Sequence, residues 1–186
     1  MPVGDSYSGK SGSGADVPEF ETLVSLHYEP LYRFAMSLAR AESDAADLVQ
    51  ETFLTWAEKG HQLQDRGKAR SWLFTTLHRR FLERQRRVTR FPEVDIATME
   101  ELPEVDPDLV NRIDGGELAR LLGRIDPQFQ AAVALFYLED YSYPEIAEVL
   151  EVPLGTVKSR IARGLAQLRA LVMDSRRGKP GEEGKS

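Results

Sequence analysis

The side chains that could do chemistry in this 186-residue chain are mainly basic ones. Residues 156–177 contain six lysines and arginines but only one acidic residue, Asp174. Such cations neutralise phosphates, and small polar side chains such as Thr156 and Ser159 form hydrogen bonds to base edges. The segment therefore predicts nucleic-acid binding. Its basic residues are Lys158, Arg160, Arg163, Arg169, Arg176 and Arg177.

A second basic block covers residues 65–90, where nine basic and two acidic residues give a balance of +7. At about 100° per residue, Trp72 and Arg79 lie on one face of a helix, opposite the apolar side. An outward aromatic ring stacks on an unpaired base while arginine neutralises phosphate. The alternative, that Trp72 is an ordinary core residue, stays open on this evidence.

An acidic segment separates the two basic blocks. Residues 91–117 hold nine acidic residues and one basic residue, Arg112, a balance of −8. The net charge of −6 therefore hides two basic blocks, and each of them predicts a surface that binds an anionic partner.

Catalytic patterns do not emerge from the sequence. The histidines His27, His61 and His78 lie in three different segments, without the spacing of metal ligands on one helix. There is no cysteine, which excludes a thiol nucleophile, and no glycine-rich phosphate loop. We expect a protein that is not an enzyme and that needs no cofactor or metal.

The segment that contains the last basic block is predicted to form a helix-turn-helix. Ser142 and Glu145 form a capping box at the start of a short helix, and Pro153 ends it. An apolar stripe then recurs at helical spacing, which leaves the basic residues on the opposite face. An αα-hairpin with a solvated face is the alternative, and Glu151 stands where such turns commonly have glycine. The stripe consists of Val157, Ile161, Leu165, Leu168 and Val172.

The remaining chain predicts an all-α protein of two small helical domains joined by an acidic flexible linker. Residues 19–40 read as a helical pair or one bent helix around Pro30, and residues 44–59 and 69–87 as further helices. On the 44–59 helix, Leu54 lies among outward polar residues, which suits a partner surface. An ordinary solvent-exposed helix is the alternative, and it stays open on this evidence. No apolar run is long enough to span a membrane and no signal peptide opens the chain, so we expect a cytoplasmic protein.

Three motifs in order, DLVQETF (47–53), SWLFTTLHRRF (71–81) and PLGTVKSRIARGL (153–165), resemble the extracytoplasmic-function sigma factors of bacterial RNA polymerase. The resemblance implies sigma region 2 at residues 19–90, an acidic linker at 91–115 and sigma region 4 at 116–173. Residues 1–18 and 174–186 are expected to be tails.

The resemblance also implies sites. The outward face of the 44–59 helix would bind the clamp helices of the polymerase β′ subunit through Asp47, Gln50, Glu51 and Leu54. The minus-ten promoter element would contact Arg66, Lys68, Trp72, Thr76, Arg79 and Arg80. The minus-thirty-five element would contact Leu154, Gly155, Thr156, Lys158, Ser159, Arg160 and Arg163.

By this resemblance the chain would bind core polymerase, including the β flap, direct it to promoters and help to melt the minus-ten element. An anti-sigma factor is a further expected partner. Two alternatives are a stand-alone helix-turn-helix regulator, which predicts a dimer on a palindromic duplex, and an adaptor that keeps only the polymerase face.

Overall fold

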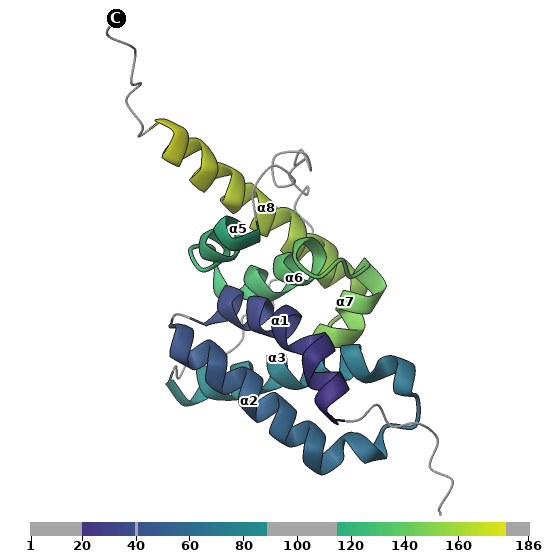
Figure 1. Cartoon of the computed structure of the whole chain (residues 1–186). Coiled ribbons are helices and arrows are strands. Elements are labelled where there is room, and N and C mark those ends of the chain that lie inside the picture. Colours follow the sequence, from purple (N-terminus) through teal and green to yellow (C-terminus); the bar gives the residue numbers. More distant parts are fainter. Residues whose placement is uncertain (1–19, 40, 89–114, 178–186) are drawn as a thin grey trace, which may run out of the picture.

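The computed structural model describes residues 20–39, 41–88 and 115–177, and within these residues all regular structure is helical (Figure 1). The predicted all-α class is confirmed. The expected tail at 1–18, the last nine residues of the chain and nearly all of the acidic linker lie outside the described residues. The helices are α1 (Phe20–Leu38), α2 (Glu42–Lys59), η1 (Gly60–Gln62), η2 (Arg66–Lys68), α3 (Ala69–Val88), α5 (Gly115–Leu122), α6 (Pro127–Tyr137), α7 (Tyr143–Leu150) and α8 (Leu154–Arg177).

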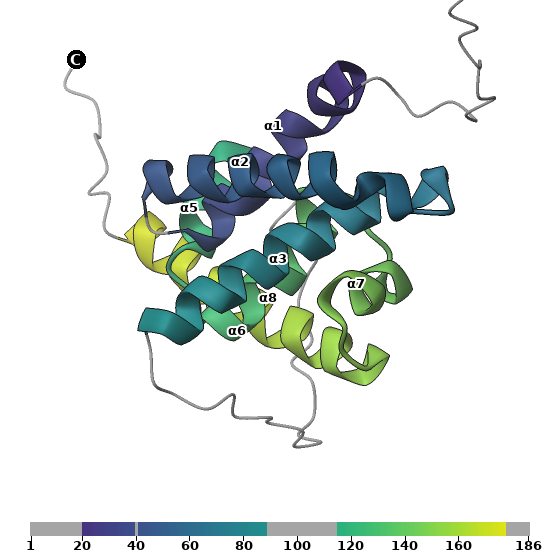
Figure 2. The same ribbon diagram turned by 90° about the horizontal axis from the view of Figure 1, so that it is seen from below.

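Helices α1, α2 and α3 form the first helical body. The first of them is one continuous helix that contains Pro30, rather than a pair of helices. Leu31 and Phe34 of α1 are fully buried, and the Phe34 ring lies 5.3 Å from that of Phe74 in α3. In Figure 2, α2 and α3 lie side by side and α1 crosses them. Apolar burial of this kind stabilises the three-helix body.

Gly60 directly follows α2, and close packing rather than an unusual backbone requires glycine at this position. Its φ of −60° is ordinary for a helix. A Cβ atom at this position would lie 2.6 Å from the ring of Trp56, which is buried under the turn. Only a residue without a side chain lets the chain turn this closely over the indole.

Helices α5 to α8 form the second body, and its helix-turn-helix is present as predicted. The five residues of the α8 stripe are all buried. The capping box of α7 also forms, since the Ser142 backbone N–H donates to the Glu145 carboxylate at 2.8 Å. Glu151, at the turn, adopts the left-handed conformation with φ 56°. Helix α8 continues to Arg177, four residues beyond the boundary that the resemblance implies.

The two bodies pack against each other. Helix α1 contacts both α5 and α6, and α3 contacts α7 (Figures 1 and 2). Between them, Glu139 of the α6–α7 turn binds Arg33 of α1 and Arg70 of α3. The buried apolar residues of both bodies form one continuous cluster, so this contact includes apolar burial as well as ion pairs.

The crossing of α6 and α8 gives a test of the second body. A Cβ atom at Gly164 would lie 2.5 Å from the Val133 side chain, so Gly164→Ala forces the helices apart. We expect a loss of about 1–3 kcal/mol in the free energy of unfolding. The control is Gly155→Ala, where a Cβ atom would meet nothing within 4 Å and helix propensity favours alanine. Equal stability of the two variants in thermal or urea unfolding would contradict the packing.

Candidate nucleic-acid interface

The basic face of α3 is positioned by the packing of its apolar face on α1 and α2. Leu73, Phe74 and Leu77 are fully buried there. Arg79 lies on the opposite face and is exposed, as predicted from the helical periodicity. Its guanidinium is not free, because Nε and Nη2 donate to the two carboxylate oxygens of Glu151 at 2.9 and 2.5 Å. This ion pair raises the pKa of Arg79 and lowers that of Glu151.

Trp72 is neither a free surface residue nor a fully buried one. It is half-buried, and its ring meets Trp56 of α2 edge to face at 5.2 Å. Thr76, one turn further along α3, is half-buried as well. Part of the indole therefore remains available to a stacking partner, while the rest fixes its position against α2.

The loop before α3 carries two of the predicted minus-ten residues. Arg66 donates from Nη1 to the carbonyl oxygen of Gly60 at 3.1 Å, and Lys68 is exposed. The Asp65 carboxylate accepts the Gly67 N–H at 2.9 Å and so caps the short η2 helix. The loop is thus folded back on the end of α2, and its lysine faces solvent.

The predicted recognition helix presents its first two turns at the surface. Leu154, Gly155 and Lys158 are exposed. The other predicted contacts, Thr156, Ser159, Arg160 and Arg163, are half-buried. Ser159 donates its hydroxyl to the Thr156 carbonyl oxygen at 3.0 Å, so its proton is used within the helix while its oxygen remains an acceptor.

Arg160, a predicted minus-thirty-five contact, lies where the two bodies meet, near His78 of α3. His78 of α3 is buried, and burial, followed by the charge of Arg160, lowers its pKa to about 4, so the imidazole is neutral. A cleft of about 490 Å³ lies here, lined by residues of α3, of the beginning of α6 and of the helix-turn-helix. Among its lining residues are His78, Phe81, Leu82, Leu150 and Arg160.

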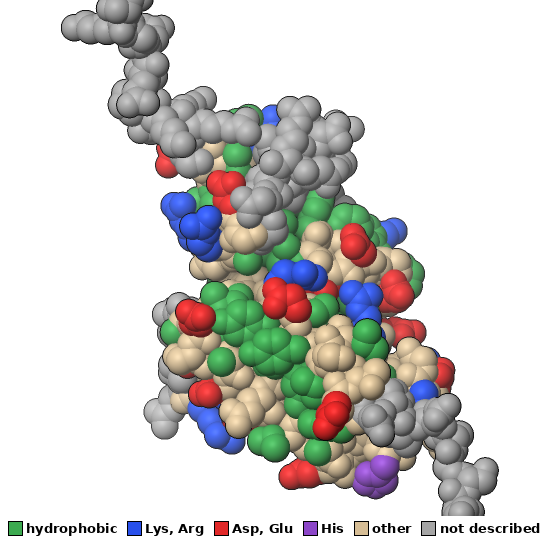
Figure 3. Space-filling view, in the orientation of Figure 1, with side chains coloured by type: hydrophobic (Ala, Val, Ile, Leu, Met, Phe, Trp, Pro, Cys, Tyr) green, Lys and Arg blue, Asp and Glu red, His purple; other side chains and the backbone are tan. Residues whose placement is uncertain are grey.

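Helix α2 presents the predicted polymerase face. Asp47, Gln50 and Leu54 are exposed, the leucine by 57% of its surface. Exposed apolar residues on α1 accompany it, and Figure 3 shows hydrophobic side chains gathered over α1 and α2. An apolar area on a charged protein is typical of a protein-binding surface. The exposed large residues of α1 are Phe20, Leu26 and Tyr28.

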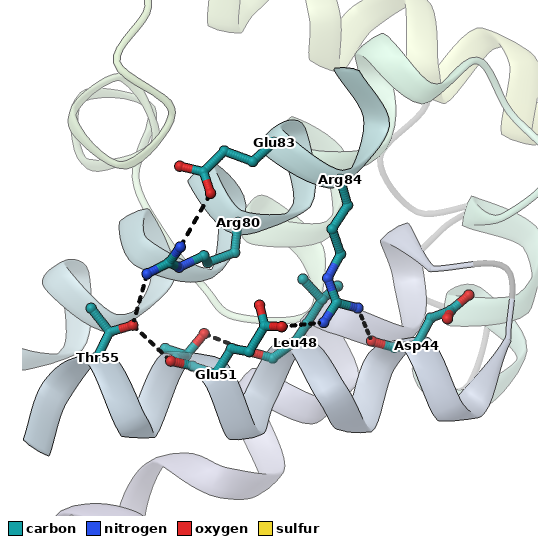
Figure 4. Close-up of polar contacts among 8 residues, drawn as sticks. Asp44, Leu48, Glu51, Thr55, Arg80, Glu83 and Arg84 are labelled. Carbon is teal, nitrogen blue, oxygen red and sulfur yellow. Dashed lines mark hydrogen bonds and ion pairs between the residues drawn. The ribbon is translucent and has the colours of Figure 1, made fainter. Parts of the chain in front are cut away.

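Glu51, the fourth predicted polymerase contact, is tied to α3 (Figure 4). Arg84 donates to its carboxylate at 2.7 Å and to the Asp44 carbonyl oxygen at 3.4 Å. Arg80, a predicted minus-ten contact, reaches the same edge of α2 through the Thr55 hydroxyl at 3.3 Å. The outward face of α2 and the basic face of α3 are therefore linked by polar contacts and set each other's position.

Glu139 links the two bodies, a role that the sequence did not reveal. Its side chain is 1% exposed, and Arg33 donates to it from Nε and Nη2 at 3.3 and 3.1 Å. Arg70 donates to its backbone oxygen at 2.6 Å and stacks over the Tyr141 ring at 4.5 Å. Its partners lie 106 and 69 positions away, so no local pattern could have identified them.

Among the described residues, no three histidines or carboxylates gather as a metal-binding group. None of the helices in the described ranges has the length and apolar character needed to cross a membrane.

Comparison with known proteins then decides the family. Residues 23–91 match the family model "Sigma-70 region 2", and residues 115–168 match "Sigma-70, region 4". The chain is 37% identical over 180 residues to the ECF RNA polymerase sigma factor SigE of Mycolicibacterium smegmatis, covering 90% of this chain and 67% of that one. It is 30% identical over 166 residues to SigL of Mycobacterium tuberculosis, covering 87% and 93%.

The chain belongs to the extracytoplasmic-function (ECF) sigma factors. It is a transcription-initiation factor that directs RNA polymerase, and the stand-alone regulator is not favoured. Among solved structures it resembles the sigma factor RpoE bound to the anti-sigma factor NepR from Bartonella quintana, with TM-score 0.66, 25% identity and 84% and 98% coverage. It also resembles CnrH bound to the cytosolic domain of CnrY, with TM-score 0.57, 26% identity and 83% and 88% coverage.

Glu139 gives this ECF sigma factor a defined pH dependence. Burial raises the pKa of Glu139 to about 7 from its ordinary 4.5, against the opposing effects of Arg33 and Arg70. A carboxyl group with a raised pKa stabilises the folded state below its unfolded pKa, and this contribution is lost as the pH rises through the folded pKa. His78, with its lowered pKa, acts in the opposite sense as the pH falls from 6.5 to about 4.

We therefore expect Glu139→Gln, which does not titrate, to gain stability relative to the parent as the pH rises from about 4.5 to 7. The gain should reach up to about 1 kcal/mol per pH unit. Urea unfolding of both proteins across this range measures it, and the contribution of His78 is common to both. A difference that does not change with pH would contradict the titration of Glu139.

Proposed function

We propose that the α7–α8 helix-turn-helix reads the minus-thirty-five element, while α3 and the loop before it bind the minus-ten element. The observation that carries this proposal is the exposed first turns of α8, combined with a basic α3 face that bears a half-exposed Trp72. Helix N-termini with small polar residues fit base edges in the major groove. Leu154, Gly155, Thr156, Lys158, Ser159, Arg160 and Arg163 are the assigned contacts.

The minus-ten contacts divide into phosphate binding and base binding. Arg66, Lys68, Arg79 and Arg80 would supply the salt-dependent affinity for phosphates. Trp72 and Thr76 would lie at the duplex edge of the melted segment, where the 62–68 loop receives an unpaired base. Unstacking a base costs a few kcal/mol, which stacking and pocket contacts offset, so binding favours local melting.

The polymerase contacts follow from the outward face of α2. Asp47, Gln50 and Glu51 with the exposed Leu54 would bind the β′ clamp helices, and region 4 would bind the β flap. An exposed leucine among carboxylates and amides gives such an interface an apolar centre and a polar rim. Polymerase then supplies the catalysis, and the chain itself is not an enzyme.

A regulatory partner is the second part of the proposal. One similar structure holds the sigma factor RpoE in complex with the anti-sigma factor NepR, and the other holds CnrH in complex with the cytosolic domain of CnrY. We assign such a partner to this chain as well, in the cytoplasm. Because the chain has no cysteine, any redox sensing would reside in that partner. The acidic linker at 91–115 would follow the polymerase channel, where its charge resembles that of a nucleic acid.

The experiment that tests this function is multi-round transcription with purified core polymerase and fragmented genomic DNA, with and without the chain. New start sites that share two spaced upstream elements would support the proposal and give the promoter sequence. Failure to bind core polymerase at all would overturn it. Binding without new transcripts would instead support the adaptor alternative.

Trp72→Ala tests the minus-ten assignment. Loss of base stacking should weaken promoter opening by about 1–3 kcal/mol while core binding is retained. Because Trp72 also packs on Trp56, Trp72→Phe is the control that keeps an aromatic plane, and both variants need an unfolding curve. Permanganate reactivity of promoter thymines measures opening. Normal promoter opening with Trp72→Ala would show that this residue has only a structural role.

Arg163→Ala tests the minus-thirty-five assignment. If Arg163 binds a base, the variant should lose about 1–3 kcal/mol of promoter affinity and relax sequence preference at one position of that element. Arg169→Ala, further along α8 and outside the assigned contacts, is the matched control. Holoenzyme binding to a promoter and to single-base variants of it, at fixed salt, measures both. An unchanged preference with Arg163→Ala would remove this residue from base reading.

A further inference from the structure

A row of polar contacts joins α2 to α3 along one edge of the first helical body (Figure 4). Arg84 of α3 donates from Nη2 to Oε1 of Glu51 at 2.7 Å. From Nη1 it donates to the backbone oxygen of Asp44, about two turns earlier in α2, at 3.4 Å. One guanidinium therefore bridges two parts of the same helix, and one of its partners is an assigned polymerase contact.

A second arginine holds the same edge of α2. Arg80 donates from Nη2 to the Thr55 hydroxyl at 3.3 Å, and this hydroxyl donates to the Glu51 backbone oxygen at 2.7 Å. Thr55 is buried, so its hydroxyl depends on protein partners rather than on solvent. The side chain and the backbone of Glu51 are therefore each linked to α3, one directly by Arg84 and the other through Thr55 and Arg80.

The direction of Arg84 separates it from the proposed minus-ten contacts. Trp72, Thr76 and Arg79 share one face of α3, and at about 100° per residue Arg84 lies roughly a third of a turn away, on the side towards α2. Its guanidinium is directed at α2 in Figure 4, and its side chain is 31% exposed. Its positive charge is paired with α2 and does not extend the phosphate-binding face of α3.

Glu51 itself stays accessible to a partner. Its side chain is 46% exposed, and the contact with Arg84 uses Oε1. The exposed Leu54 and Glu58 follow it along α2, and with the arginines of α3 they line a cleft of about 280 Å³. A cationic side chain of a partner can therefore approach the carboxylate from solvent while Arg84 holds it from the side of α3.

A glutamate that is held in one orientation binds a partner more tightly than a freely rotating one. On a helix surface this side chain samples several rotamers, and a partner must select one of them. When the carboxylate is already fixed, that ordering cost does not oppose association, which strengthens binding by about two- to ten-fold. The opposing effect, repulsion between Arg84 and a cation of the partner, is screened by solvent at this partly exposed site.

We propose that Arg84 is a positioning residue of the polymerase-binding face, which holds the Glu51 carboxylate in the orientation that a cation of polymerase binds. This inference rests on the proposed function of Glu51 as a polymerase contact. It adds α3 to a surface that the sequence assigned to α2 alone. Arg84 then contributes to polymerase binding without touching polymerase.

A double-mutant cycle tests this inference. Arg84→Ala should raise the Kd for core polymerase about two- to ten-fold. In the Glu51→Ala background the same change should have little effect, because no carboxylate remains to be positioned. Arg84→Lys, which can still donate to Oε1, should recover most of the affinity. The matched control is Arg87→Ala, which removes the same charge from an exposed position of the same cleft and should leave the Kd unchanged.

Competition with a dye-labelled parent chain for purified core polymerase, at fixed salt and without DNA, measures each Kd. The buried apolar faces of α2 and α3 keep the two helices packed in all of these variants, and urea unfolding of each free chain checks this. A merely structural role of Arg84 would lower core affinity equally with and without the Glu51 side chain, so the cycle separates the two roles.

An unchanged Kd with Arg84→Ala would overturn the inference, as would an equal loss in the Glu51→Ala background or no recovery with Arg84→Lys. Unchanged core binding combined with weaker promoter binding by the holoenzyme would make Arg84 a phosphate contact, which also contradicts the inference. A parent chain that does not bind core polymerase would overturn the proposed function and this inference with it, and that result is distinct from all the others.

Discussion

The buried carboxylate of Glu139 is the constraint on which the arrangement of this chain depends. Burial makes the charged form of this group costly and raises its pKa to about 7, so the carboxylate depends on Arg33 and Arg70 beside it as long as the turn stays buried. These arginines belong to two different helices of region 2, and the glutamate belongs to region 4. One turn thereby fixes the position of α6, and through α6 that of the helix-turn-helix packed upon it.

Other ion pairs also link helices of the molecule, and their interaction energies are smaller. Arg84 holds the outward face of α2 through Glu51, and Arg79 holds the turn of the helix-turn-helix through Glu151. Both pairs are partly exposed, so salt and competing anions weaken them. The chain thus combines one buried link with exposed links that phosphates could replace, which suits a protein that must bind a polyanion.

The sequence predicted the local structure well, because local signals determine it. The α8 stripe and the box at Ser142 and Glu145 depend on residues a few positions apart, and the structure confirms both. The contacts of Glu139 and Glu151 could not be predicted, since their partners lie 69 to 106 positions away. Glu151 gave one local sign in the sequence, because it stands at a turn position where such motifs commonly have glycine. The individual DNA and polymerase contacts remain predictions.

The most direct test of the account is the separation of regions 2 and 4 before and after the chain enters the transcription complex. With spin labels on residues 58 and 170, pulsed dipolar spectroscopy gives the distance distribution in the free chain, with core polymerase, and with core and promoter DNA. We expect one short distance in the free chain and a longer one in the complete complex, where the two regions bind separate promoter elements. The same short distance in all three states would contradict it.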